Sequence, residues 1–134
     1  NIRKETKKMN IYLYTLTGNG RKFLTEAGID METVKVLKSK TIAEEDFVLV
    51  TNTIGFGEIP KPVERFLEKN HELCKGIVAG GNRNWGQNFA VAGDLITEKY
   101  PDIPLLMKIE LNGTKKQREQ FKKMMEEFYG FTDN

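Results

Sequence analysis

Short apolar runs alternate along this chain with segments that have the apolar spacing of helices. The runs rich in strand-forming residues predict five strands, at residues 9–14, 33–37, 47–50, 74–79 and 104–111. The segments with apolar residues three to four positions apart predict four helices, at residues 21–27, 60–70, 88–100 and 114–129. Strands that alternate with helices are typical of a doubly wound α/β fold with a parallel sheet and helices on both faces.

The apolar positions also predict which surfaces are buried. Residues 47–50 are almost purely apolar, as expected of a central strand covered on both faces. In the helix at 60–70, Val63, Phe66 and Leu67 share one face. In the last helix, apolar residues are expected to point inward and basic residues to form a solvated outer face. The inward set is Phe121, Met124, Met125 and Phe128, and the outward set is Lys115, Lys116, Arg118 and Lys123.

The length fits one domain. The chain has 134 residues, of which 39% are hydrophobic, enough for a single core. No linker or repeat divides it, so we expect one domain over residues 9–129. The polar ends, residues 1–8 and 130–134, are expected to be flexible.

Charge and hydropathy limit the classes of partner that the protein is expected to bind. Lys and Arg number 21 against 19 Asp and Glu, a formal net charge of +2, which is too balanced to indicate nucleic-acid binding. No apolar run approaches the roughly 20 residues of a membrane-spanning helix, and the polar start has no signal-peptide core. We therefore expect a cytoplasmic protein that binds neither nucleic acid nor membrane.

Side-chain chemistry for catalysis is sparse. Cys74 is the only cysteine and His71 the only histidine, so neither an internal disulfide nor a metal site built from these residues is expected. The sequence shows no paired carboxylates, no nucleophile with a base and no catalytic residue of another kind. A redox reaction on this chain would have to be carried by a cofactor.

Three loops rich in Gly, Asn and Thr each follow an apolar run. They are residues 15–20, 51–57 and 80–86, called here the first, second and third loops. In a parallel sheet, loops after the carboxyl ends of strands emerge on one edge, so the three can converge on one ligand. Their backbone amides and threonine hydroxyls suit a phosphate, and Trp85 or Phe56 could cover an aromatic ring. The sequence therefore predicts a site for a flat, phosphorylated cofactor.

The first loop matches neither common phosphate motif. Phe23 stands where a dinucleotide fingerprint has its third glycine, and no Gly-Lys-Ser/Thr follows as in a P-loop. A threonine-rich turn at the start of a helix can still surround a phosphate with hydroxyls and amides. The alternative interpretation is a helix cap and a tight turn only.

The second and third loops suit a redox ring. Gly55 and Gly57 leave two peptide units free to adopt more than one orientation, and a carbonyl that turns toward a ring nitrogen favours the reduced form. The third loop adds polar side chains and Trp85, which alone would fit a core position equally well.

These loops resemble the NrdI family, the flavodoxin-like activators of class Ib ribonucleotide reductase. The first loop is similar to the phosphate loop of flavodoxins. The similarity extends from about Met9 to Phe128, and its most specific segments are residues 55–60, 81–86 and 104–108. The resemblance implies the strand order 2-1-3-4-5. Gly20 is a departure, because flavodoxins usually carry a threonine there.

The resemblance implies an FMN protein whose reduced flavin reacts with dioxygen to supply superoxide. The oxidant would serve assembly of the metal/radical cofactor in the small subunit of class Ib ribonucleotide reductase. An unidentified reductant would reduce the flavin, and the protein would be an activator more than a stand-alone enzyme. Two alternatives are an ordinary flavodoxin that carries electrons between soluble partners and a flavin-free interaction module. The expected FMN-binding residues are Thr15, Leu16, Thr17, Gly18, Asn19, Gly20, Thr51, Asn52, Thr53, Ile54, Gly55, Phe56, Gly57, Gly81, Asn82, Arg83, Asn84, Trp85, Gly86 and Phe89.

Overall fold

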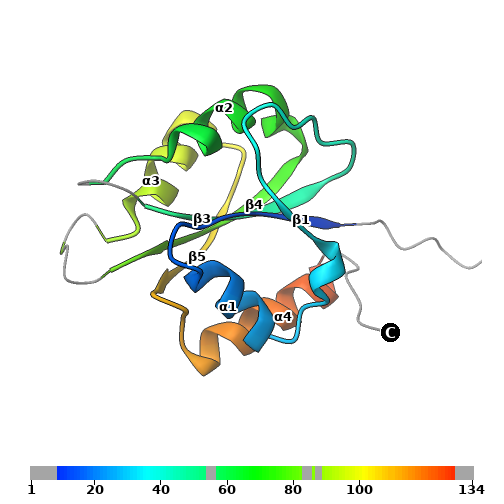
Figure 1. Ribbon diagram of the computed structural model, residues 1–134, viewed down its shortest axis with the longest axis vertical. Coiled ribbons are helices and arrows are strands. Elements are labelled where there is room, and N and C mark those ends of the chain that lie inside the picture. The colour runs from blue at the N-terminus through cyan, green and yellow to red at the C-terminus, as the bar shows by residue number, and fades with distance from the viewer. Residues whose placement is uncertain (1–8, 54–56, 83–85, 87–88, 129–134) are drawn as a thin grey trace, which may run out of the picture.

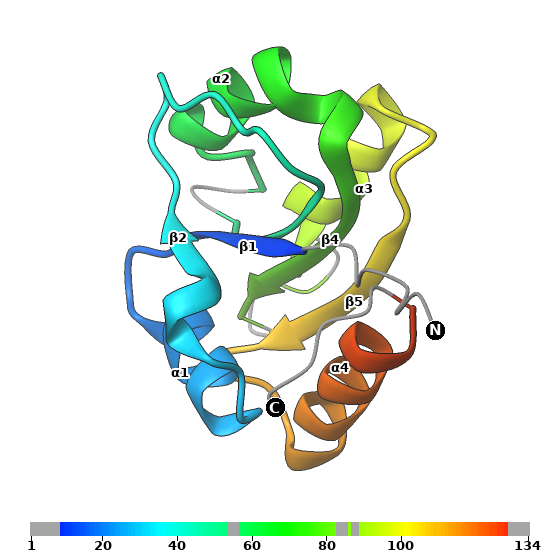
Figure 2. The same ribbon diagram turned by 90° about the vertical axis from the view of Figure 1, so that its right-hand side faces the viewer.

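Five parallel strands form one sheet in the order β2-β1-β3-β4-β5 (Figures 1 and 2). The computed structural model describes residues 9–53, 57–82, 86 and 89–128, and all structural statements concern these residues. The strands are β1 (Asn10–Tyr14), β2 (Val34–Val36), β3 (Phe47–Asn52), β4 (Cys74–Gly81) and β5 (Leu105–Glu110). The predicted fold class and strand order are confirmed.

Helices cover both faces of the sheet. Helices α1 (Asn19–Glu26) and α4 (Lys115–Phe128) lie on one face, and α2 (Lys61–Asn70) and α3 (Val91–Lys99) on the other (Figure 1). Single 3-10 turns, η1 (Met31–Thr33) and η2 (His71–Leu73), precede β2 and β4. Within the described ranges, no helix combines the length and apolar character needed to cross a bilayer.

Side chains that alternate along the strands belong to two hydrophobic clusters, one on each face of the sheet. In β3, Val48 and Val50 join the cluster beneath α1 and α4, whereas Phe47 and Leu49 join the cluster beneath α2 and α3. All four are at most 1% exposed, which confirms β3 as a strand buried on both faces.

The predicted helix faces are largely confirmed. Val63, Phe66 and Leu67 of α2 are buried, as are Phe121 and Met125 of α4. Met124 is half-buried, and the side chain of Phe128 lies outside the described residues.

Arg118 does not belong to the solvated basic face that the pattern predicted. Its Nη1 lies 3.4 Å from Glu26 Oε1 of α1 and donates to the carbonyl oxygens of Asn112 and Gly113. The side chain is 19% exposed. A guanidinium can reach carbonyls and a carboxylate together, so Arg118 links α4 to α1 and to the turn before α4.

Several element boundaries differ from the predictions, and the differences concern the loops. Strand β3 continues through Asn52 and β4 through Gly81, because Thr51 pairs with Ala79, Asn52 with Gly80, and Gly81 with Glu110. Neighbouring strands therefore supply the pairing that local sequence does not indicate. Helix α1 starts within the first loop, at Asn19, and α3 starts at Val91, three residues later than predicted.

Candidate functional site

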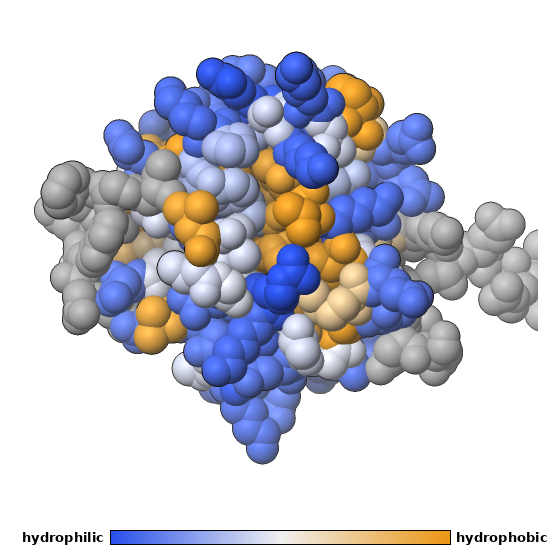
Figure 3. Space-filling model, viewed as in Figure 1, coloured by the Kyte–Doolittle hydropathy of each residue, from blue (hydrophilic) through white to orange (hydrophobic). Residues whose placement is uncertain are grey.

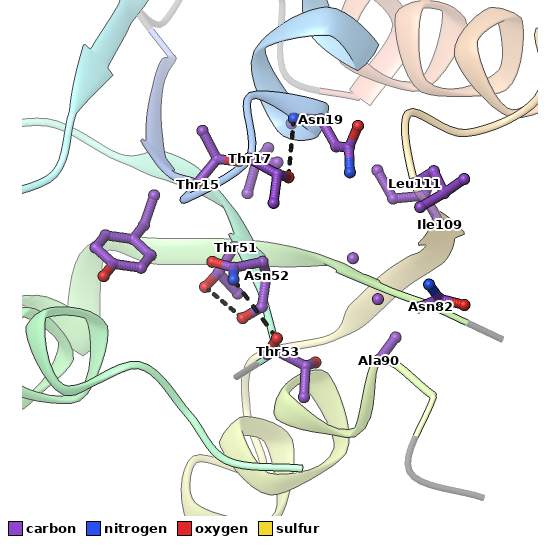
Figure 4. Close-up of a pocket in the computed structure, with 15 residues that line it drawn as sticks. Thr15, Thr17, Asn19, Thr51, Asn52, Thr53, Asn82, Ala90, Ile109 and Leu111 are labelled. Carbon is purple, nitrogen blue, oxygen red and sulfur yellow. Dashed lines mark hydrogen bonds between the residues drawn. The ribbon is translucent and has the colours of Figure 1, made fainter. Parts of the chain in front are cut away.

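A cavity of about 170 Å³ opens at the edge of the sheet where β1, β3, β4 and β5 end. Figure 4 shows the first loop on one side, the end of β3 across from it, and the ends of β4 and β5 beside them. Residues that lie far apart in the sequence thus line one hollow, with polar groups set in a largely apolar surface.

The structure brings nine of the predicted site residues together around this cavity. They are Thr15, Thr17, Asn19, Gly20, Thr51, Asn52, Thr53, Gly81 and Asn82. Five more are described but do not line it, namely Leu16, Gly18, Gly57, Gly86 and Phe89. The remaining six lie outside the described residues: Ile54, Gly55, Phe56, Arg83, Asn84 and Trp85.

The cavity also has a partly apolar wall that the sequence analysis missed. It comprises Tyr14, Val50, Ala90, Ile109 and Leu111, and Gly80 of the third loop lines the cavity as well. Tyr14 is the last residue of β1, and Leu111 directly follows β5. These two residues could have been predicted from their positions at strand ends, because the carboxyl ends of parallel strands meet at one edge of the sheet.

Threonine hydroxyls organise the first loop. Thr15 Oγ1 accepts the backbone N–H of Gly18 at 3.1 Å, and Thr17 Oγ1 accepts that of Asn19 at 3.4 Å. These two amides are therefore directed at hydroxyls of their own loop. Each hydroxyl keeps its hydrogen for a further acceptor, so the turn is compatible with an anion at the positive end of α1.

Gly20, the departure from the flavodoxin pattern, has a packing role. A Cβ at this position would lie 2.8 Å from Leu13 Cδ1 and 3.4 Å from Val50 Cγ1. The absence of a side chain therefore lets the first turn of α1 approach β1 and β3 closely.

Asn52 carries an unusual polar atom. Its Oδ1 is buried and has no hydrogen-bond partner, while its Nδ2 is 3.5 Å from the carbonyl oxygen of Thr53 (Figure 4). A buried acceptor left unpaired costs about 1–3 kcal/mol, so such atoms are uncommon unless they serve a ligand. The cavity thus offers threonine hydroxyls that can donate and an amide oxygen that can accept. FMN has complementary groups, because its phosphate accepts and its ribityl hydroxyls donate.

The end of β3 is tied to α3. Thr53 Oγ1 accepts the backbone N–H of Ala92 at 3.2 Å, which satisfies an amide in the first turn of a helix that has no side-chain cap of its own. Thr53 thus connects the second loop to the helix that follows the third.

The entry to α3 is sterically constrained. Ala90 adopts a left-handed conformation, with φ 50° and ψ 30°, and its backbone lies against Gly81. A Cβ on Gly81 would lie 2.6 Å from the nitrogen of Ala90. A glycine at the end of β4 is therefore required for this close approach.

Lys108 of β5 anchors the chain just before α3. Its Nζ is 2.6 Å from Asp94 Oδ2 and 3.4 Å from the carbonyl oxygen of Phe89. Gly57 has φ +113°, a backbone conformation that side chains disfavour. The second loop thus ends in a glycine conformation, and Lys108 fixes the segment that follows the third loop.

The shifted pKa values belong to buried groups outside the cavity lining. Burial raises the pKa of the Cys74 thiol to about 12, and burial, followed by Glu44 and Glu45, raises that of Tyr12. Cys74 begins β4 and therefore lies at the other end of the strand from the cavity. The described residues that line the cavity contribute hydrogen-bonding groups and determine its shape.

A parallel sheet in this order, with a cavity at its carboxyl edge, defines a flavodoxin-like protein. A solved structure of a short-chain flavodoxin associated with a non-canonical PDU bacterial microcompartment is similar, with a TM-score of 0.63. The two share 18% identity, and the similarity covers 88% of this chain and 93% of that one. The family model described as NrdI Flavodoxin like matches residues 11–123, so the chain belongs to the NrdI flavodoxin-like family. This membership implies that the protein binds a flavin.

Proposed function

We propose that this protein binds FMN and, when reduced, reacts with dioxygen to supply superoxide to the small subunit of class Ib ribonucleotide reductase. The superoxide would serve assembly of that subunit's metal/radical cofactor. The observation that carries the proposal is the family match over residues 11–123, and the cavity at the carboxyl edge of the sheet supports it.

The first loop would hold the phosphate. Thr15 and Thr17 keep hydroxyl hydrogens to donate, and the positive end of α1 favours an anion. Thr53 and Gly57 would border the ring on one side and Asn82 and Gly86 on the other. The sequence adds Ile54, Gly55, Phe56, Arg83, Asn84 and Trp85 to this ring site.

The flavin would supply the one-electron chemistry with dioxygen that protein side chains lack. The chain itself would bind the cofactor, orient it and limit the access of water to the reactive edge. The small subunit would close that edge, because an oxidant that escapes into bulk water is lost.

The cofactor can be identified directly. We expect one FMN per chain and no FAD, since only the first loop resembles a phosphate site. Mass spectrometry of the flavin released from the purified protein distinguishes the two, and FAD would contradict the assignment. Replacing Thr17 with valine removes a donor to the phosphate and should weaken FMN binding more than riboflavin binding.

The reaction requires a separate test. The photoreduced protein is mixed with oxygenated buffer, and superoxide is measured as cytochrome c reduction that superoxide dismutase abolishes. The metal-loaded small subunit is then tested for radical formation with and without the reduced protein. We expect superoxide release and radical formation that depend on both proteins. Efficient electron transfer to a soluble acceptor without either result would instead support an ordinary flavodoxin carrier.

A further inference from the structure

The acceptor atom of Asn52 is the feature of the cavity that its protein contacts leave unexplained. Asn52 ends the central strand β3, and its backbone pairs with Gly80 of β4. Its Oδ1 is buried without a hydrogen-bond partner, whereas its Nδ2 has a long contact with the Thr53 carbonyl oxygen. Among the buried side-chain nitrogen and oxygen atoms of the described residues, it is the one without a partner.

The partner of the unpaired Asn52 oxygen must be a hydrogen-bond donor. A carboxamide oxygen only accepts hydrogen bonds, so a phosphate oxygen or a flavin carbonyl cannot satisfy it. A hydroxyl or an N–H can. The terminal torsion of an asparagine side chain is broad, so the amide can turn toward a ligand in the cavity at small cost.

The position of Asn52 favours a hydroxyl donor. Figure 4 shows Asn52 across the cavity from Thr15 and Thr17, the residues proposed to hold the phosphate. In FMN, the ribityl chain with its three hydroxyls directly follows the phosphate, and the ring lies beyond it. The residues proposed for the ring come after Asn52 along the chain or lie on the third loop.

We propose that Asn52 Oδ1 accepts a hydrogen bond from a ribityl hydroxyl and thereby makes the site selective for flavins that carry this chain. The inference rests on the proposed flavin site and adds a specificity determinant to it. It also explains why a buried acceptor has no partner within the protein: the ligand supplies that partner.

The test compares two flavins that share the ring but differ in the chain. Riboflavin carries the ribityl hydroxyls without a phosphate, whereas lumiflavin carries a methyl group in their place. Both are titrated into the cofactor-free full chain and followed by quenching of flavin fluorescence. Wild type should bind riboflavin more tightly than lumiflavin.

Asn52→Leu, which removes the acceptor at similar size, should lower the riboflavin-to-lumiflavin affinity ratio about tenfold, the value of one ordinary hydrogen bond. Lumiflavin affinity itself should stay unchanged. Asn52→Asp is the matched control, because it keeps acceptor oxygens at the same place and should preserve the ratio. Riboflavin is used for this control because it lacks the phosphate that the new carboxylate would repel.

The outcomes separate the inference from the proposed function. A wild-type chain that binds none of FMN, riboflavin and lumiflavin contradicts the flavin site itself. A wild-type chain that binds them, with an Asn52→Leu ratio equal to that of wild type, contradicts the role of Asn52 alone. If Asn52→Leu does not fold, Asn52→Asp decides: a tenfold lower ratio in this variant, despite its acceptors, overturns the inference.

Discussion

Two asparagine side chains at opposite edges of the sheet differ in their hydrogen bonding. At the end of α2, Asn70 is 3% exposed and fully paired: its Oδ1 accepts from Ala43, and its Nδ2 donates to Thr41 and Phe66. At the carboxyl edge, Asn52 leaves a buried oxygen without a partner. A polar group that stabilises the fold finds its partners within the chain, whereas one that serves a ligand can remain unpaired.

The two edges also differ in burial and in backbone conformation. At the edge opposite the cavity, β4 begins with Cys74, whose thiol is buried. The cavity edge includes the left-handed residues Ala90 and Leu111, and Leu111 is 48% exposed. Conformational strain in the chain thus occurs where the ligand is proposed to bind, which is common at functional sites.

The largest predicted effect comes from substituting Asn70. Asn70→Leu removes three hydrogen bonds and leaves the buried Ala43 amide and the part-buried Thr41 carbonyl without these partners, so the free energy of unfolding should fall by about 3 kcal/mol. Asn52→Leu should change it by less than about 1 kcal/mol, because the lost acceptor had no partner. Urea unfolding of the cofactor-free chains measures both. Equal losses would remove the distinction between the two asparagines.

The next effect concerns adjacent glycines at the end of β4. Gly81→Ala should cost about 2 kcal/mol, since its Cβ would meet the backbone of Ala90 at 2.6 Å, and it should also weaken flavin binding by displacing the entry to α3. Gly80→Ala is the control, because its nearest contacts, to Ile109 and Thr51, are at an ordinary 3.6 Å. Thermal unfolding compares the two variants, and FMN titration compares Gly81→Ala with wild type. An equal loss of stability in both variants would show that the close approach is unimportant.

A smaller effect is expected for Thr53. Thr53→Val removes the acceptor for the Ala92 amide and should cost about 1 kcal/mol of stability, whereas Thr53→Ser keeps the hydroxyl and should cost less. Denaturant unfolding of both variants measures the difference. If serine is as destabilising as valine, the Thr53 methyl group matters more than the hydrogen bond.

Cys74 makes a prediction about pH. Because burial raises its pKa to about 12, the folded chain keeps a proton that the unfolded chain loses near pH 9. Stability should therefore fall as pH rises above 9, by about 1–2 kcal/mol at pH 10 relative to a Cys74→Ala variant when the two curves are aligned at pH 7. Urea unfolding of both chains from pH 7 to 10 provides the test, and parallel curves would contradict it.

Much of the fold could be predicted from local pattern. The apolar run of β3 and the apolar face of α2 report their own burial, and the alternation of strands and helices indicates the α/β class. Strand order could not be worked out this way and came from the family resemblance.

The details of the site depend on contacts distant in sequence. The extension of β3 to Asn52 depends on Gly80 across the sheet, and the left-handed conformation of Ala90 has no signal in an alanine. Tyr14 and Leu111 reach the cavity because strand ends converge, which local composition does not indicate. The sequence predicts that the loops converge on one ligand, and that stays a prediction; it does not indicate which of their residues line the cavity.

The proposed function depends first on binding of FMN at the carboxyl edge of the sheet. The most direct measurement is a titration of the 15N-labelled cofactor-free chain with FMN, followed by amide chemical shifts. We expect saturation at one FMN per chain, with the largest shifts at residues 15–20, 51–53 and 80–82. No saturable shift, or shifts centred on the opposite edge around His71, Cys74 and Tyr100, would contradict it.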